Sequence, residues 1–190
     1  MGRNSSGNRG GGRGNRLMQS VFKSERSIRM NDFETLIAFD AKGKVLFSKK
    51  GEQYEVSGLS NNELKALNNA VVTHNHPRSL GERGVRAIGN SFGDVDLSTA
   101  IANNVREIRA VTPTYTFSMK RPKGGWGVSV EKFRETHKKV NREVRVEFER
   151  YLWNQGYSDE AVARVETRHF HEVNKRLAKI FGWNYSKRRG

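Results

Sequence analysis

The sequence contains no cysteine. Disulfides and thiolate metal ligands are therefore excluded, and a metal ion would have to be bound by histidine and carboxylate side chains. The sequence also lacks any apolar run that approaches the about 18–20 residues of a membrane-spanning helix. Its N-terminal residues lack the apolar core of a secretory signal. We expect no membrane partner and a cytoplasmic location.

Apolar residues are scarce as well, at 35% of the 190 residues. This length suits one domain with an appendage. Residues 1–16 contain Gly, Ser, Asn and Arg and almost nothing apolar. Because such a segment cannot offset its ordering entropy by burial, we expect it to be a disordered tail. We expect an α+β core domain over residues 17–127 and a helical hairpin over residues 128–190.

Positive charge is abundant. Lysine and arginine number 35 against 20 acidic residues, which gives a formal net charge of +15. Such a field attracts nucleic acid or another polyanion, although a solubilising surface charge is the alternative. Arg78, Arg83 and Arg86 lie in a segment rich in glycine and serine that we expect to be a basic loop. They are the candidate nucleic-acid contacts, and no zinc finger or RNP motif accompanies them.

The first half of the chain predicts a hairpin and two further strands. Residues 36–39 and 45–47 are apolar runs separated by a turn in which Gly43 is free to take a positive φ. Ser60 and Glu63 form a capping-box pattern ahead of a short helix. Residues 107–111 and 115–119 alternate like strands. The pattern predicts an α+β fold, a small mixed sheet with helices.

The helices of the second half are predicted from periodicity. An apolar stripe that includes His137 runs through residues 130–153, and a second helix begins after Ser158, so the two form an antiparallel hairpin. His169 lies on the apolar stripe of that second helix and His171 opposite, which favours packing and surface roles. For residues 17–29 the sequence does not decide between a short helix and an extended segment. The basic residues 187–189 are expected to be solvated.

Two histidines stand at the end of a predicted strand, in the segment V-V-T-H-N-H-P of residues 71–77. Residues two apart on a strand share a face, so His74 and His76 project together while Asn75 turns away. Pro77 ends the strand because it cannot donate to a sheet ladder. Two imidazoles that converge there indicate a metal site or an acid–base pair. The alternative is one ring packed inside and the other exposed.

Acidic residues near the start of the next predicted helix complete the pattern. Ser91 and Asp94 are spaced as a capping box, which is a structural reason for S-x-x-D. Asp94 and Asp96 both suit the positive end of a helix dipole. Glu34 stands at the mouth of the predicted hairpin, earlier in the chain.

The segment H-N-H-P, followed by an aspartate at a helix start and preceded by a glutamate on an earlier strand, resembles the JAMM metalloenzyme pattern of the JAB/MPN type. The wording T-H-N-H-P is closest to the RadC-like branch. The resemblance covers roughly residues 34–119, about half of the chain. It implies a metal-dependent hydrolase that acts on an amide or isopeptide bond.

Carried over residue by residue, the resemblance implies that His74, His76 and Asp96 bind zinc, with Asp94 as the alternate ligand. It implies Glu34 as the general base. The family's serine aligns with Gly93. The hydroxyl that stabilises the oxyanion is therefore either missing or supplied by Ser91.

A second resemblance extends over the whole of residues 34–190. The wording I-A-F-D-A-K-G-K-V-L, T-H-N-H-P and Y-T-F-S-M is similar to C-terminal effector domains of phage MuF-type head-morphogenesis proteins. It implies a nuclease-like toxin, with His74 or His76 as acid–base, in a chain that is delivered or virion-associated if phage-encoded. The net charge favours this alternative. A non-catalytic nucleic-acid-binding or virion-associated module is the third.

Overall fold

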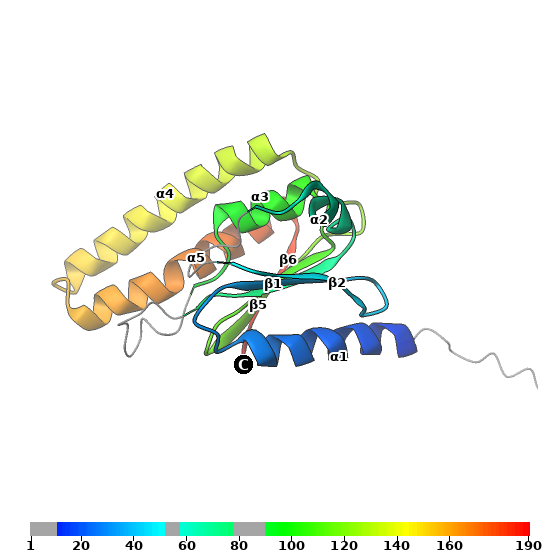
Figure 1. Cartoon of the computed structure of the whole chain (residues 1–190). Coiled ribbons are helices and arrows are strands. Elements are labelled where there is room, and N and C mark those ends of the chain that lie inside the picture. Colours follow the sequence, from blue (N-terminus) through cyan, green and yellow to red (C-terminus); the bar gives the residue numbers. More distant parts are fainter. Residues whose placement is uncertain (1–10, 52–57, 78–89) are drawn as a thin grey trace, which may run out of the picture.

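The computed structural model describes residues 11–51, 58–77 and 90–190. The predictions for residues 1–10 and for Arg78, Arg83 and Arg86 lie outside the described residues. The described chain forms a six-stranded mixed sheet in the order β2-β1-β3-β4-β5-β6, with helices on both of its faces (Figure 1). The predicted α+β class is confirmed. The elements are α1 (Gly11–Ile28), β1 (Thr35–Phe39), β2 (Val45–Lys50), α2 (Asn61–Ala66), β3 (Val71–Asn75), α3 (Asp94–Ala102), β4 (Glu107–Val111), β5 (Tyr115–Lys120), α4 (Val130–Asn154), α5 (Asp159–Phe181) and β6 (Asn184–Arg189).

The predicted hairpin is confirmed as β1 and β2, which pair antiparallel. Its turn needs glycine because Gly43 has a φ of +85°, and a Cβ there would lie 2.9 Å from the Cα of Leu17. The capping box of Ser60 and Glu63 is also confirmed at the start of α2. β3 then pairs antiparallel with β1 and parallel with β4. A parallel pair needs a crossover connection, and the segment that contains α3 supplies it.

The two faces of the sheet are covered by different helices. α1 lies on one face, and α3, α4 and α5 lie on the other (Figure 1). Leu17 and Val21 of α1 pack with Ile37, Phe39 and Val71 in one apolar cluster. A larger cluster on the opposite face joins the sheet to α3, α4 and α5. The alternation of side chains along β3 therefore sends odd and even residues into different environments.

α4 and α5 lie side by side and run in opposite directions, with the chain reversing between them (Figure 1). Val140 and Val144 of α4 and Val173 and Leu177 of α5 belong to the same buried cluster as strand residues of the sheet. The division predicted at residue 127 is therefore not a break in the core. The αL cap at Gly182, with a φ of +69°, ends α5 and returns the chain to the sheet.

Residues 187–189 belong to β6, which pairs antiparallel with β5 along its whole length, and Arg188 and Arg189 are exposed there as expected. Two local predictions need correction. Residues 11–16, assigned to the disordered tail, are part of α1, and the open segment 17–29 is helical up to Ile28. The capping box predicted from Ser91 and Asp94 is wrong, because Gly93 is the N-cap of α3.

Candidate metal centre

His74 and His76 converge at the carboxyl end of β3, as their spacing predicts. Their Nε2 atoms lie 2.9 Å apart, and the side chain of His74 is buried. His76 follows the last strand residue, and its backbone N–H donates to the carbonyl of Val111 on β4. Asn75 turns to the other face. Both rings therefore face one site, in which His74 is buried and His76 is half-buried.

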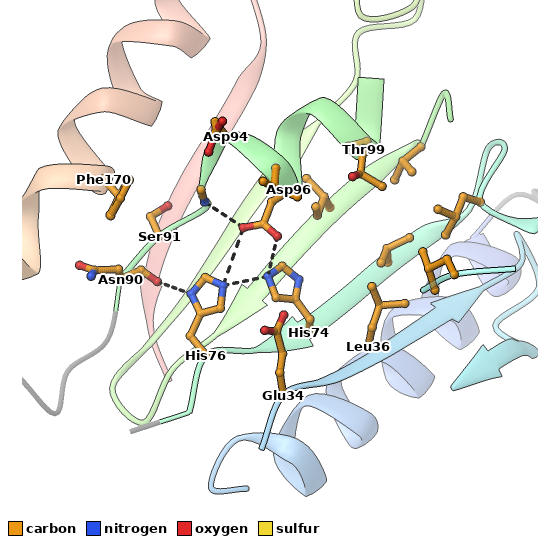
Figure 2. Close-up of a pocket in the computed structure, with 18 residues that line it drawn as sticks. Glu34, Leu36, His74, His76, Asn90, Ser91, Asp94, Asp96, Thr99 and Phe170 are labelled. Atoms are coloured by element: carbon orange, nitrogen blue, oxygen red, sulfur yellow. Dashed lines mark hydrogen bonds and ion pairs between the residues drawn. The ribbon is translucent and has the colours of Figure 1, made fainter. Parts of the chain in front are cut away.

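Asp96 faces both imidazoles from the first turn of α3 (Figure 2). Its Oδ1 lies 3.5 Å from Nε2 of His74, and its Oδ2 lies 3.8 Å from Nε2 of His76. The same Oδ2 accepts a hydrogen bond from the backbone N–H of Gly93, at 2.8 Å, which fixes the carboxylate. Asp94 is exposed and points away from the rings (Figure 2). Of the two aspartates, Asp96 is the one that the fold brings to the histidines.

Glu34 approaches His74 from the segment that leads into β1 (Figure 2). Glu34, His74 and His76 each offer a ligand atom, and these atoms lie within 4.8 Å of one another. Two imidazole nitrogens and a carboxylate oxygen are donors that suit zinc and other divalent transition metals. The described residues thus contain a buried group that could hold a metal ion.

The side chain of Asn75 fixes the backbone on both sides of Glu34. Its Oδ1 accepts from the N–H of Thr35 at 2.8 Å, and its Nδ2 donates to the carbonyl of Phe33 at 3.0 Å. Asn75 is fully buried. The residue between the two histidines therefore positions the glutamate from the opposite face of the sheet. From the sequence alone, strand alternation predicts only that Asn75 points away from the histidines.

A backbone carbonyl determines which nitrogen of His76 is free. Nδ1 of His76 lies 2.7 Å from the carbonyl oxygen of Asn90. A carbonyl can only accept, so Nδ1 carries the proton and Nε2 of the neutral ring keeps its lone pair directed at the site. Metal-binding histidines usually have such a partner on the second ring nitrogen.

The charges of the site shift the pKa values of its members in different directions. Burial lowers the pKa of His74, but the carboxylates of Asp96 and Glu34 outweigh it and leave the pKa raised. Burial and the neighbouring charge of His74 lower the pKa of His76. Burial raises the pKa of Asp96, yet the two imidazoles hold it well below its ordinary value. The site therefore favours an ionised Asp96, and the two histidines titrate apart.

These groups lie at one end of a cavity of about 630 Å³. Apolar side chains, among them Leu36, Val72 and Ile108, form much of its wall. The acidic side chains in the wall are Glu34, Asp94 and Asp96, and the described lining includes no lysine or arginine. The described part of the cavity therefore suits an uncharged or positively charged group better than a phosphate.

Ser91, predicted to stabilise an oxyanion, lies in the wall of the same cavity, but its hydroxyl is engaged. Its Oγ lies 2.8 Å from the hydroxyl of Tyr185 and accepts from Nδ2 of Asn174 at 3.1 Å. The Tyr185 hydroxyl in turn lies 2.9 Å from Nδ1 of His171. This chain ties β6 and α5 to the segment whose Asn90 carbonyl holds His76.

The residues that position Ser91 could not be found from periodicity. Asn174 is fully buried among apolar residues of α5, and Tyr185 depends on the long-range pairing of β6. His171 packs against Phe117 and Tyr185 rather than on the surface. Nε2 of His169 lies 2.6 Å from Oδ1 of Asn141 on α4.

Comparisons with known proteins add no family to this description. No family model, curated protein or solved structure matches the chain. Among the described helices, none combines the length and the apolar character needed to cross a membrane.

Proposed function

We propose that the chain is a zinc-dependent hydrolase of JAMM-like type that cleaves an amide or isopeptide bond. The observation that carries this proposal is the convergence of Asp96 on the paired Nε2 atoms of His74 and His76, with Glu34 beside them. Three of these residues match the ligands that the JAMM resemblance implies, and the fourth matches its general base. The donor set also suits zinc, because it consists of imidazole and carboxylate alone.

In this proposal His74, His76 and Asp96 hold the ion. When bound, zinc lowers the pKa of a coordinated water to about 7 and polarises a carbonyl. Glu34, which is 7% exposed, accepts the proton of the attacking water and returns it to the departing amine nitrogen. Asn75 holds the backbone of Glu34 for this transfer, and the Asn90 carbonyl keeps the proton of His76 on Nδ1.

The cavity supports a carbonyl substrate over a phosphodiester. Its described lining is apolar and acidic, and a phosphodiester would bring negative charge towards Asp94 and Asp96, with no arginine among the described lining residues to receive it. A lysine side chain, the amine component of an isopeptide bond, would carry its stem along Leu36 and Val72 and leave a positive amine near the acids.

The test separates metal binding from turnover. Purified protein is loaded with zinc, and hydrolysis of fluorogenic peptide and lysine-isopeptide substrates is followed with and without a chelator. Glu34→Gln should keep the zinc and lower kcat by about 10²–10⁴-fold, because it removes a general base. Asp96→Asn should lose zinc affinity and activity together.

His169→Gln is the matched control, since it removes an imidazole from α5 that contacts Asn141 and not the site. It should leave zinc content and turnover unchanged. Zinc-independent turnover, or a Glu34→Gln variant with full activity, would contradict the proposal.

A metal-independent nuclease is the second candidate, and the net charge of +15 is the observation that favours it. In that case RNA or DNA is cleaved in the presence of a chelator, and His74 or His76 transfers the proton. Cleavage that survives the chelator and is lost in His76→Gln would select this function over the hydrolase.

A further inference from the structure

A second cavity, of about 370 Å³, lies on the opposite face of the sheet from the histidines. It runs between α1 and strands β5 and β6. We call it the basic groove. Its lysine and arginine residues are Arg26, Arg29, Arg109, Lys120, Arg188 and Arg189.

Two acidic residues near the floor of the groove, Glu25 and Glu107, form ion pairs with Arg109. Glu25 of α1 accepts from Nε of Arg109 at 2.5 Å, and Glu107 accepts from Nη1 of the same guanidinium at 2.7 Å. All three side chains are buried. Arg109 therefore bonds both carboxylates, and Oε2 of Glu107 also lies 3.8 Å from Nζ of Lys120. Among the described residues, the ion pairs of the groove thus involve Arg109 and Lys120, and not its exposed arginines.

The exposed arginines of the rim have no such partner. Arg26, Arg188 and Arg189 are exposed, and no ion pair joins them to a carboxylate within the described parts of the chain. Guanidinium groups gathered on one groove repel one another, and an anion bound between them relieves that repulsion. Cationic charge on three different segments, α1, β5 and β6, thus faces one concave surface.

The uncharged residues of the groove indicate which anion it takes. Thr116 and Ser186 line the groove with the arginines, and arginine with serine or threonine is the usual set of phosphate contacts. The hydroxyl of Ser118 is not available, because it donates to Glu107 at 2.7 Å. Phe22 lines the same groove with 41% of its surface exposed. An exposed aromatic ring beside guanidinium groups is a platform for an unpaired base. We propose that the basic groove binds a single-stranded nucleic acid, with its phosphates on the arginines and a base on Phe22.

The groove and the metal centre are separate sites. On β3, Thr73 contacts Glu25 beneath the groove, whereas the next residue, His74, faces Asp96. On β4, Arg109 forms the floor of the groove, and Ala110 belongs to the core on the other side. The proposal that the groove binds nucleic acid therefore does not depend on the proposed hydrolase activity.

The test measures binding of a fluorescein-labelled 20-mer of oligothymidylate to the full chain by fluorescence anisotropy, across a series of salt concentrations. Arg26→Gln, Arg188→Gln and Arg189→Gln are combined in one variant. If each arginine contacts one phosphate of a single strand, the slope of log K against log salt becomes less steep by about 2. Phe22→Ala should weaken binding by roughly 5–160-fold, because it removes the stacking of one base.

The matched control combines Lys138→Gln, Lys139→Gln and Arg142→Gln, which remove the same charge from exposed positions of α4. It should keep the wild-type slope and affinity. Circular dichroism verifies that each variant is folded. If the groove variant and the control lost affinity equally, the effect would come from the overall charge of the protein, and the proposal would be overturned. Tighter binding of a duplex of the same length would overturn the assignment of a single strand.

Discussion

The two faces of the sheet bury charged side chains in different ways. On the face covered by α1, a permanent cation, Arg109, lies between Glu25 and Glu107 and satisfies both. On the face covered by α3, the carboxylates of Asp96 and Glu34 meet two imidazoles, whose charge depends on protonation. The first cluster is complete as it stands. The second contains groups that could hold a metal ion.

This difference explains why only one cluster is a candidate for chemistry. A buried guanidinium that is bonded on both sides has no free coordination or proton-transfer capacity, so its role is structural. Imidazoles and carboxylates that share a cavity can take up or release a proton or a metal ion. The comparison leads to four predictions, in order of falling magnitude.

The largest effect concerns the face covered by α1. Arg109→Met should lower the free energy of unfolding by about 3–5 kcal/mol, because it removes the buried guanidinium that bonds both Glu25 and Glu107. Urea unfolding in the presence of a chelator measures this loss. The control Arg188→Met, at an exposed position, should change stability by less than about 0.5 kcal/mol. An equally small effect at Arg109 would contradict the contrast between the faces.

The second effect belongs to the face that carries the histidines. Zinc at about 100 times its Kd should raise the free energy of unfolding by about 2.7 kcal/mol, since it binds the folded chain alone. His76→Gln should abolish this gain while Arg188→Met retains it. A zinc-induced gain of equal size in His76→Gln would place the bound ion elsewhere.

The third prediction concerns the hydroxyl chain that joins β6 to the site. Tyr185→Phe should lower the free energy of unfolding by about 1–2 kcal/mol, because Ser91 and His171 lose a buried partner. Tyr157→Phe removes a hydroxyl that bonds Glu149 on the surface and should have little effect. If the two variants were equally stable, the chain from His171 to Ser91 would not contribute to the fold.

The smallest effect is a pH dependence. Burial, followed by the nearby charge of Lys187, lowers the pKa of His171 to about 4 from an ordinary value of 6.5. Below pH 6.5 the unfolded chain takes up this proton first, so the contribution of His171 to stability falls from pH 6.5 towards 4 and then levels.

His171→Gln, which has no charge to gain, should show a shallower loss of stability with acid than the wild type over the same interval. Unfolding in urea at a series of pH values, with a chelator present, measures the difference. Parallel curves for the two proteins would contradict the lowered pKa.

Local signals predicted much of the fold. The hairpin around Gly43, the capping box of Ser60 and the helix that begins after Ser158 each depend on residues within a few positions of one another. The pairing of His74 with His76 follows from strand alternation alone. Such features are readable because their physical cause is local.

The remaining features depend on contacts between distant parts of the chain. The polar sequence of β6 has no apolar alternation, so only its pairing with β5 makes it a strand. Asn174 reaches Ser91 and the Phe92 carbonyl across 80 or more positions. The first residue of α3 determines whether Asp94 or Asp96 faces the histidines. The capping box predicted at Ser91 was wrong, so residue spacing alone did not predict where this helix begins.

The most direct test of the metal centre is the metal content of the protein after incubation with zinc and exhaustive dialysis, measured by inductively coupled plasma mass spectrometry. We expect about one zinc per chain in the wild type and in His169→Gln, with a near-complete loss in a folded His74→Gln variant. A wild-type chain that retains no zinc, or a His74→Gln chain that retains as much as the wild type, would contradict the account.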